Sequence, residues 1–170
     1  EGYALYTPDV AGKIMNTAYQ QGLKIAYDAG SPELVANNRN TLKVLLNDYV
    51  TVAFFNELEA CAFADSDDPL IALQKLSELC PLAVVKLGSK GVYIAEENAE
   101  KISYVAAKNV NPLDSTGAGD FWAAAFLYAW LTGKSVEKAA DLANAMAATV
   151  IQQIGTELNE EFWRRFQLLI

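Results

Sequence analysis

The sequence predicts an α/β fold with a mostly parallel sheet, on two observations. Short, continuous apolar runs rich in β-branched and aromatic residues alternate with segments whose apolar residues recur at helical spacing. Such alternation is typical of parallel strands connected by crossover helices. The composition, 52% hydrophobic and 11% aromatic over 170 residues, supplies enough apolar side chains for a substantial core. We therefore expect a single folded domain rather than a disordered chain.

The first half is predicted to contain three strands, each reached through a helix. Each strand is assigned from its buried apolar run, and each helix from its periodicity or its cap. The expected elements are, in order, a helix ended by Gly22, a strand at 23–28, a helix at 33–48, a strand at 50–55, a short helix from Asn56, a helix capped by Asp68 with Pro69 in its first turn, and a strand at 82–86.

The second half changes character, because a hairpin is followed by helices alone. Two strand-like segments, 91–95 and 101–105, flank a polar turn that contains Glu96, Glu97, Asn98 and Glu100. We expect this hairpin at an edge of the sheet. Helices are predicted at 117–131, 135–153 and 160–169, separated by Gly133 and Gly155. Ser135 is a suitable N-cap, but Lys138 three residues later excludes a capping box there.

Charge and residue usage exclude several function classes. Thirteen basic against 21 acidic residues give a net charge of −8, which disfavours nucleic acid and anionic membranes as partners. No apolar run reaches the ~20 residues of a membrane span, and no charged and then apolar leader opens the chain. Histidine is absent, which excludes Ser-His-Asp and Cys-His catalysis and histidine metal sites. Acid–base chemistry is thus left to carboxylates or lysines.

The two cysteines indicate a reducing compartment. Cys61 and Cys80 lie in apolar helical patterns, where cysteine usually serves as a small buried hydrophobic residue rather than half of a disulfide. Disulfides are rare in reducing compartments. We therefore expect a cytoplasmic protein.

The segment Asp114-Ser115-Thr116-Gly117-Ala118-Gly119-Asp120 is the most informative part of the chain. Its glycines permit a tight turn and leave backbone N–H groups accessible where an apolar helix begins, which is the chemistry of an anion site. A carboxylate in the first helical turn is what phosphoryl transfer requires as a base for the attacking hydroxyl. The alternative is that Asp120 caps the helix and the glycines are ordinary helix-start residues.

This segment resembles the signature of the ribokinase and adenosine kinase family, the PfkB carbohydrate kinases. Three further segments agree with it in the right order: Asn56-Glu57-Leu58-Glu59 resembles the family's Asn-x-x-Glu motif, the segment 84–91 resembles its strand and glycine turn, and Asn144 lies where the family often has an asparagine at the nucleotide. The resemblance implies a ribokinase-like three-layer α/β/α domain, with residues 1–170 as its C-terminal part carrying the ATP-binding and catalytic loop.

The activity implied by the resemblance is transfer of the γ-phosphoryl group of ATP to a hydroxymethyl group of a sugar or nucleoside. Asp120 would take the proton of the acceptor, while the N–H groups of Gly117, Ala118 and Gly119 would stabilise the transferring phosphoryl group. Nucleotide contacts would come from five residues: Lys86, Gly88, Gly91, Thr116 and Asn144. The alternative to nucleotide contact is, for Lys86, a solvent-exposed position on an edge strand. For Asn144, the alternative is a structural hydrogen bond to a neighbouring loop.

The resemblance also implies a Mg²⁺ ion that accompanies ATP. Asn56 and Glu59 share a helix face and would orient waters around this ion. Their alternative role is an N-cap with a favourable first-turn acid. Asp114 and Thr116 correspond to positions that bind a monovalent cation, K⁺, in many family members.

The chain departs from the family in two respects. After the strand ending at Asp28 it has Ala29-Gly30-Ser31-Pro32, nearer the adenosine kinase side than the Asp-x-Asn-x-Arg stretch of many sugar kinases. It also begins with Glu1 and is about half as long as the family's domain, so the first strands, the lid and most acceptor contacts are expected to precede it. We expect residues 1–170 alone to be inactive and the whole enzyme to be a homodimer.

Two other function classes were weighed. A non-catalytic nucleotide- or sugar-binding descendant of the fold would not need to retain Asp120. An unrelated dinucleotide-binding dehydrogenase is disfavoured, because Gly117-Ala118-Gly119 lies late in the chain and lacks the Gly-x-Gly-x-x-Gly spacing.

Overall fold

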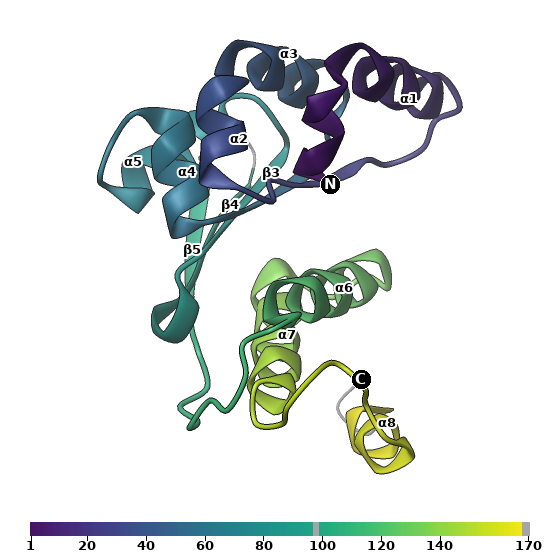
Figure 1. Cartoon of the computed structure of the whole chain (residues 1–170), viewed down its shortest axis with the longest axis vertical. Helices are drawn as coiled ribbons and strands as arrows, with labels where there is room; N and C mark the ends of the chain where they lie inside the picture. The colour runs from purple at the N-terminus through teal and green to yellow at the C-terminus, as the bar shows by residue number, and fades with distance from the viewer. Residues whose placement is uncertain (97–98, 168–170) are drawn as a thin grey trace. The chain divides into compact units, whose positions relative to one another are not determined.

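The computed structural model describes residues 1–96 and 99–167 and has the predicted α/β architecture (Figure 1). Its sheet has five strands in the order β1-β2-β3-β4-β5. The chain forms two compact units: unit 1 comprises residues 1–88 and 93–103, and unit 2 comprises 89–92 and 104–170.

Unit 1 has the predicted strand–helix alternation and a parallel arrangement of its first three strands. Its elements are η1 (Gly2–Tyr6), α1 (Pro8–Gln20), β1 (Ala26–Asp28), α2 (Pro32–Asn37), α3 (Arg39–Tyr49), β2 (Val52–Asn56), α4 (Glu57–Ala64), α5 (Pro69–Ser77) and β3 (Leu82–Lys86). Strand β1 pairs in parallel with β2, and β2 pairs in parallel with β3. The predicted β3 and the Asp68 cap of α5 are confirmed.

Three predicted elements in unit 1 have different bounds. The single helix expected at 33–48 is two helices, α2 and α3, which meet at Asn38. The side-chain amide of Asn38 donates to the Leu34 carbonyl at 3.0 Å and thereby closes the first of them. Strand β1 begins only at Ala26, and the N–H of the preceding Ile25 donates to the Thr51 hydroxyl at 3.0 Å. The strand predicted at 50–55 is shifted to β2, Val52–Asn56.

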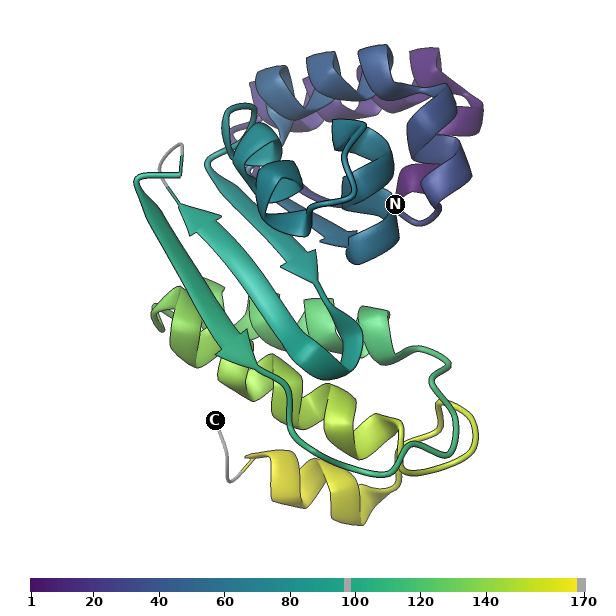
Figure 2. The same cartoon turned by 90° about the vertical axis from the view of Figure 1, so that its left-hand side faces the viewer.

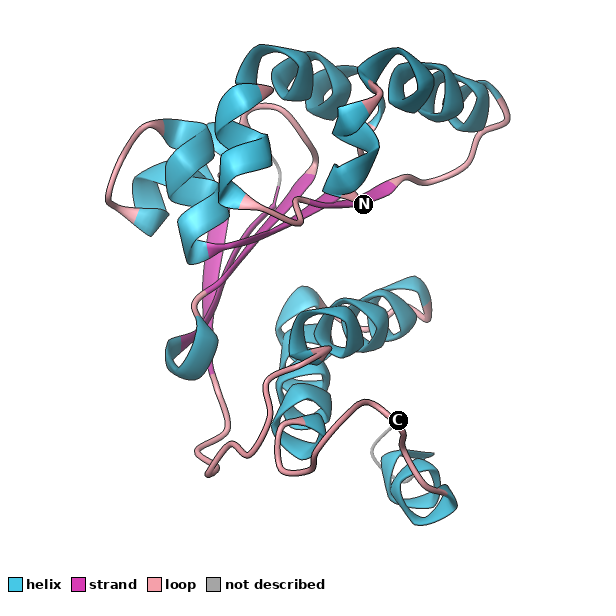
Figure 3. Cartoon of the chain, in the orientation of Figure 1, coloured by secondary structure: helices cyan, strands magenta, loops and turns pink. Residues whose placement is uncertain are grey.

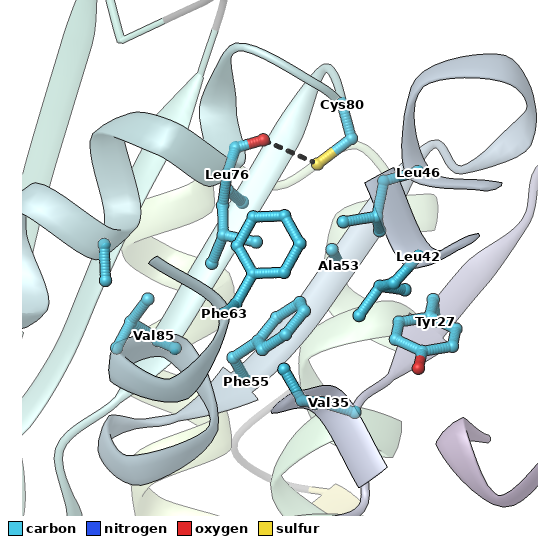
Figure 4. Close-up of a cluster of buried hydrophobic side chains, with 14 of the residues drawn as sticks. Tyr27, Val35, Leu42, Leu46, Ala53, Phe55, Phe63, Leu76, Cys80 and Val85 are labelled. Carbon is cyan, nitrogen blue, oxygen red and sulfur yellow. Dashed lines mark hydrogen bonds between the residues drawn. The ribbon is translucent and has the colours of Figure 1, made fainter. Parts of the chain in front are cut away.

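The core of unit 1 lies between the parallel strands and their helices (Figure 4). Tyr27 and Phe55 have ring centroids 6.2 Å apart, and Phe55 and Phe63 have centroids 5.9 Å apart. Cys80 is buried beside Leu76, and both cysteines are free, as predicted. Because β2 and β3 are covered almost completely, their sequences read as continuous apolar runs rather than alternating ones.

The predicted hairpin consists of β4 (Gly91–Glu96) and β5 (Lys101–Ala106), whose residues are divided between the two units. Figure 2 shows that its strands run in opposite directions, so the sheet is mixed. A Cβ atom on Gly91 would collide with the Val105 carbonyl oxygen, so only glycine permits this approach of β4 to β5. Of the predicted polar turn, Glu97 and Asn98 lie outside the described residues.

Unit 2 is mainly helical (Figure 3). It contains the short η2 (Gly88–Lys90) from Ser89 onward and the helices α6 (Ala118–Leu131), α7 (Val136–Val150) and α8 (Glu160–Gln167). Ser135 accepts a hydrogen bond from the Lys138 N–H and caps α7, as predicted. The predicted end of α8 at Leu169 lies outside the described residues. Within the described ranges, no helix has the length and apolarity required to cross a bilayer.

Candidate active site

Polar side chains gather in unit 1 where the parallel strands end. Asp28 ends β1, Asn56 ends β2 and Lys86 ends β3. The Lys86 Nζ atom donates to Asp28 Oδ2 at 2.8 Å and lies 6.0 Å from the centroid of the Phe54 ring. Since Asp28 is paired with Phe54 in the β1–β2 register, this ion pair crosses β2 above that ring. The Asp28 side chain is only 28% exposed and the Lys86 side chain only 16%.

Asn56 and Glu59 form a complete capping box at the start of α4. The Glu59 N–H donates to Asn56 Oδ1 at 2.9 Å, and the Asn56 N–H donates to Glu59 Oε2 at 2.8 Å. Glu59 is 4% exposed, and this burial raises the pKa of its carboxyl group, with the negative charge of Asp28 adding to the effect. The Asn56 hydrogen bond and the positive charge of Lys86 act in the opposite direction. The capping role weighed from the sequence is therefore realised.

A magnesium ion is compatible with this capping box. A carboxylate has about four lone-pair sites, so one accepted backbone N–H leaves capacity for a metal-bound water. Carboxylate and amide oxygens are the donors that Mg²⁺ prefers, and Mg²⁺ commonly keeps several waters. Among the described residues, no three Asp, Glu, Cys or His side chains gather into a direct metal cage. A site at Asn56 and Glu59 would hold the ion through water.

The glycine-containing segment 114–120 of unit 2, which we call the phosphate-type loop, leads into α6. Gly117 is the N-cap of α6 and has φ +74°, a conformation that disfavours any residue with a Cβ atom. Asp120 lies in the first turn of α6 and is exposed. The Ala118 N–H donates to the Ser115 carbonyl at 3.2 Å, so this group takes part in the turn itself. The positive end of α6 thus carries an accessible carboxylate.

Asp114 binds the loop to the segment that follows α7. Its Oδ1 atom accepts from the Thr116 N–H at 2.9 Å and from the Thr116 hydroxyl at 2.6 Å. Its Oδ2 atom accepts from the Gly155 N–H at 2.9 Å. These hydrogen bonds lower the pKa of the Asp114 carboxyl to about 2, with the Thr116 hydroxyl as the largest cause. Asp114 and Thr116 therefore stabilise the loop, and cation binding at them stays a prediction.

Asn144 uses both ends of its side-chain amide inside unit 2. Its Oδ1 atom accepts from Trp122 Nε1 at 2.8 Å, and its Nδ2 atom donates to the Ala106 carbonyl at 2.9 Å. The residue is 6% exposed. This geometry corresponds to the structural role left open from the sequence, while a contact with a nucleotide stays a prediction.

The predicted site residues thus fall into two groups. Unit 1 brings together Asp28, Asn56, Glu59 and Lys86, and unit 2 brings together the segment 114–120. Gly88 has φ +60° with open space at its Cβ position, whereas Gly91 serves the close approach of β4 to β5. Sequence reasoning missed the pairing of Asp28 with Lys86 and the bridge from Trp122 to Asn144. Both depend on strand register or helix packing, which no local motif reveals.

Comparison with known proteins shows to which family the chain belongs. The model of the pfkB family of carbohydrate kinases matches residues 5–162. The chain belongs to this family. The match covers all four motif regions from Asn56 to Asn144 on which the resemblance was based.

Two curated relatives illustrate the similarity. The chain is 32% identical over 133 residues to an uncharacterised sugar kinase of Archaeoglobus fulgidus, a match covering 77% of this chain and 51% of that protein. It is 31% identical over 156 residues to an ATP-dependent ribose-1-phosphate kinase of Halopiger xanaduensis, covering 83% of this chain and 44% of the relative. The chain therefore spans about half the length of the curated relatives it matches.

Solved structures confirm the ribokinase-like fold. The adenosine kinase of Sinorhizobium meliloti superposes with a TM-score of 0.83 at 30% identity, over 92% of this chain and 48% of that protein. A probable sugar kinase of Rhizobium etli has the same TM-score at 29% identity, again over 92% and 48%. The predicted fold class is thus confirmed, and the chain spans about half of each of these structures.

Proposed function

We propose that this chain is the nucleotide-binding and catalytic part of an ATP-dependent kinase that phosphorylates a hydroxyl group of a sugar or nucleoside. The observation that carries the proposal is the exposed carboxylate of Asp120 in the first turn of α6, directly after the left-handed Gly117. This places a base beside a helix end suited to phosphate. Family membership and the sugar and nucleoside kinases among the relatives support it.

In this proposal, Asp120 accepts the proton of the acceptor hydroxyl as its oxygen attacks the γ-phosphorus of ATP. The bond from that phosphorus to the β–γ bridging oxygen breaks, and ADP leaves. The N–H groups at the start of α6 stabilise the negative charge on the transferring phosphoryl oxygens, because the helix dipole adds to their hydrogen bonds. The chemistry then depends mainly on how accurately both reactants are positioned.

The residues of unit 1 would serve the phosphates and their metal. Asn56 and Glu59 would bind waters of a Mg²⁺ ion, which neutralises phosphate charge when bound. Lys86 would donate to a phosphate oxygen, exchanging its partner Asp28 for the nucleotide. Gly88 and Gly91 would flank the nucleotide with backbone only. A K⁺ ion at Asp114, a cytoplasmic location and a dimeric assembly complete the proposal.

Substitution of Asp120 by Asn tests the proposal, in the protein as its gene encodes it. We expect turnover to fall ~10²–10⁴-fold, as for a lost general base, with ATP affinity nearly unchanged. Asp9→Asn is the matched control, since Asp9 is also an exposed first-turn acid, on α1. Steady-state kinetics with a panel of sugars and nucleosides gives turnover, and calorimetry gives ATP affinity. Wild-type turnover in the Asp120 variant would refute the assignment of the base.

A further inference from the structure

A buried chain of hydrogen bonds lies directly behind the first turn of α6. It runs from Trp122 Nε1 to Asn144 Oδ1, and from Asn144 Nδ2 to the carbonyl oxygen of Ala106, the last residue of β5. Trp122 is 5% exposed and Asn144 6% exposed. The chain therefore joins α6, α7 and the end of β5 within unit 2.

Trp122 is well placed to control the orientation of Asp120. Residues two positions apart in an α-helix are separated by about 200° around the helix axis. Trp122 and Asp120 have this spacing, so they point to nearly opposite sides of α6. This agrees with the burial of Trp122 and the exposure of Asp120. The Trp122 ring also stacks on Phe126, with centroids 5.2 Å apart and an interplanar angle of 14°. A rotation of the first turn that moved Asp120 would have to break the Trp122 contacts.

Both ends of the Asn144 side-chain amide are used in this arrangement. If the side chain turned toward a nucleotide, the buried Trp122 N–H and the Ala106 carbonyl would lose their partners, which is unfavourable for groups shielded from water. The amide also fixes its own orientation, because Trp122 can only donate and the carbonyl can only accept. The bridge therefore has a single satisfied state.

We propose that Trp122 and Asn144 are positioning residues for Asp120, rather than Asn144 being a nucleotide ligand. The bridge holds the first turn of α6 so that the Asp120 carboxylate keeps the orientation needed for proton transfer. This inference rests on the proposed function, since it assumes that Asp120 is the base.

The test uses three variants and a double variant of the protein as its gene encodes it. Trp122→Phe keeps an aromatic ring beside Phe126 but removes the N–H donor together with part of the ring volume, whereas Asn144→Ala removes the centre of the bridge. Trp130→Phe is the matched control, because it makes the same change farther along α6. For each variant, kcat, the Michaelis constants, the ATP dissociation constant by calorimetry and the melting temperature are measured, with kcat expressed per ATP-binding site.

We expect kcat to fall ~10–100-fold in both Trp122→Phe and Asn144→Ala, as a small misplacement of a catalytic group can do. ATP affinity should stay within about twofold of wild type, and Trp130→Phe should retain its kcat. The double variant should be no slower than the slower single variant, because both changes break one bridge. If Asn144→Ala does not fold, Trp122→Phe carries the test by itself.

Two results would overturn the inference. Weakened ATP binding in Asn144→Ala with normal kinetics in Trp122→Phe would make Asn144 a nucleotide ligand. Lower melting temperatures with wild-type kcat per site would reduce the bridge to a purely structural role. The Asp120→Asn variant separates this failure from failure of the proposed function. If Asp120→Asn loses turnover, the assignment of Asp120 as the base is kept, and only the positioning role of Trp122 and Asn144 is rejected.

Discussion

Glu59 shows how one buried carboxylate can be structurally satisfied and still electrostatically unfavourable. Its carboxylate accepts the Asn56 N–H, yet burial raises its pKa, so its ionised form is disfavoured in the fold. A glutamine could occupy the same capping box, because its carbonyl oxygen also accepts that N–H. The acid at this position therefore carries a charge that the capping box does not require.

Substitution of Glu59 by Gln should separate the two roles. A raised acid pKa means that the favourable, protonated state is fully present below the unfolded pKa near 4.5 and is lost as pH rises. The variant should thus be as stable as wild type at pH 4 and more stable at pH 7. Its Mg²⁺ requirement should rise ~10-fold or more, the effect of losing an outer-shell partner. Urea unfolding at both pH values and a Mg²⁺ titration of activity measure these effects.

Glu57→Gln provides the control, since Glu57 is the other acid in the first turn of α4. It should leave both the Mg²⁺ dependence and the pH dependence of stability near wild type. An unchanged Mg²⁺ dependence in the Glu59 variant would return Asn56 and Glu59 to capping alone.

At the scale of elements, the loop before α6 is held by the segment that follows α7. The N–H groups of Leu113 and Asp114 both donate to the Ile151 carbonyl, and Asp114 Oδ2 accepts from Gly155. A Cβ atom on Gly117 would lie 2.8 Å from Thr156 Cγ2, so the same segment packs against the helix start. The phosphate-type loop thus depends on residues some forty positions later in the chain.

Substitution of Asp114 by Asn should make this connection visible through its pH dependence. A lowered pKa contributes stability that is present above the unfolded pKa of about 3.8 and is lost as pH falls toward about 2. Wild type should therefore unfold at a higher temperature than Asp114→Asn at pH 6, and the difference should shrink between pH 4 and pH 2. Thermal unfolding at pH 6, 4 and 3 tests this expectation.

The exposed Asp67 offers a comparison, because Asp67→Asn removes a carboxylate without these hydrogen bonds to the loop. Its effect on melting temperature should be small at every pH. A difference between wild type and Asp114→Asn that did not change with pH would contradict the assignment of an ionised carboxylate as the connecting group.

At the scale of the whole molecule, the chain spans about half the length of the curated relatives that it matches. In unit 1, apolar side chains on or beside η1 and α1 are exposed, among them Tyr6 at 75%, Ile14 at 63% and Leu23 at 61%. Such exposure over neighbouring elements favours association with another protein surface. The catalytic residues of the proposal are present, but the chain spans about half the length of these relatives, and we predict that most acceptor contacts lie in the other half.

A polypeptide of residues 1–170 alone should therefore have little kinase activity and should self-associate. Catalysis by positioning fails when one reactant is not held, and exposed apolar surface drives aggregation. Acceptor-dependent ATP consumption and light scattering measure the two effects. A monodisperse monomer with turnover of ~1 s⁻¹ or more, the low end for kinases, would contradict this expectation.

The parts of the site that could be predicted from sequence are those formed by neighbours along the chain. Asn56 and Glu59 are three residues apart, and the turn from Asp114 to Asp120 is continuous, so their roles follow from helix-start chemistry and glycine conformations. The strands β2 and β3 were predictable for the same reason, as short apolar runs bounded by clear signals.

The sequence by itself determined the α/β class, the order of the elements, the family and the residues at the start of α4 and α6. Only the tertiary structure decided which partners those residues have. Lys86 meets Asp28 across 58 residues, Asp114 meets Gly155 across 41, and Trp122 meets Asn144 across 22. Local propensity and hydrogen-bonding chemistry act over a few residues, whereas these pairs depend on strand register and helix packing, which the burial of apolar surface throughout each unit sets.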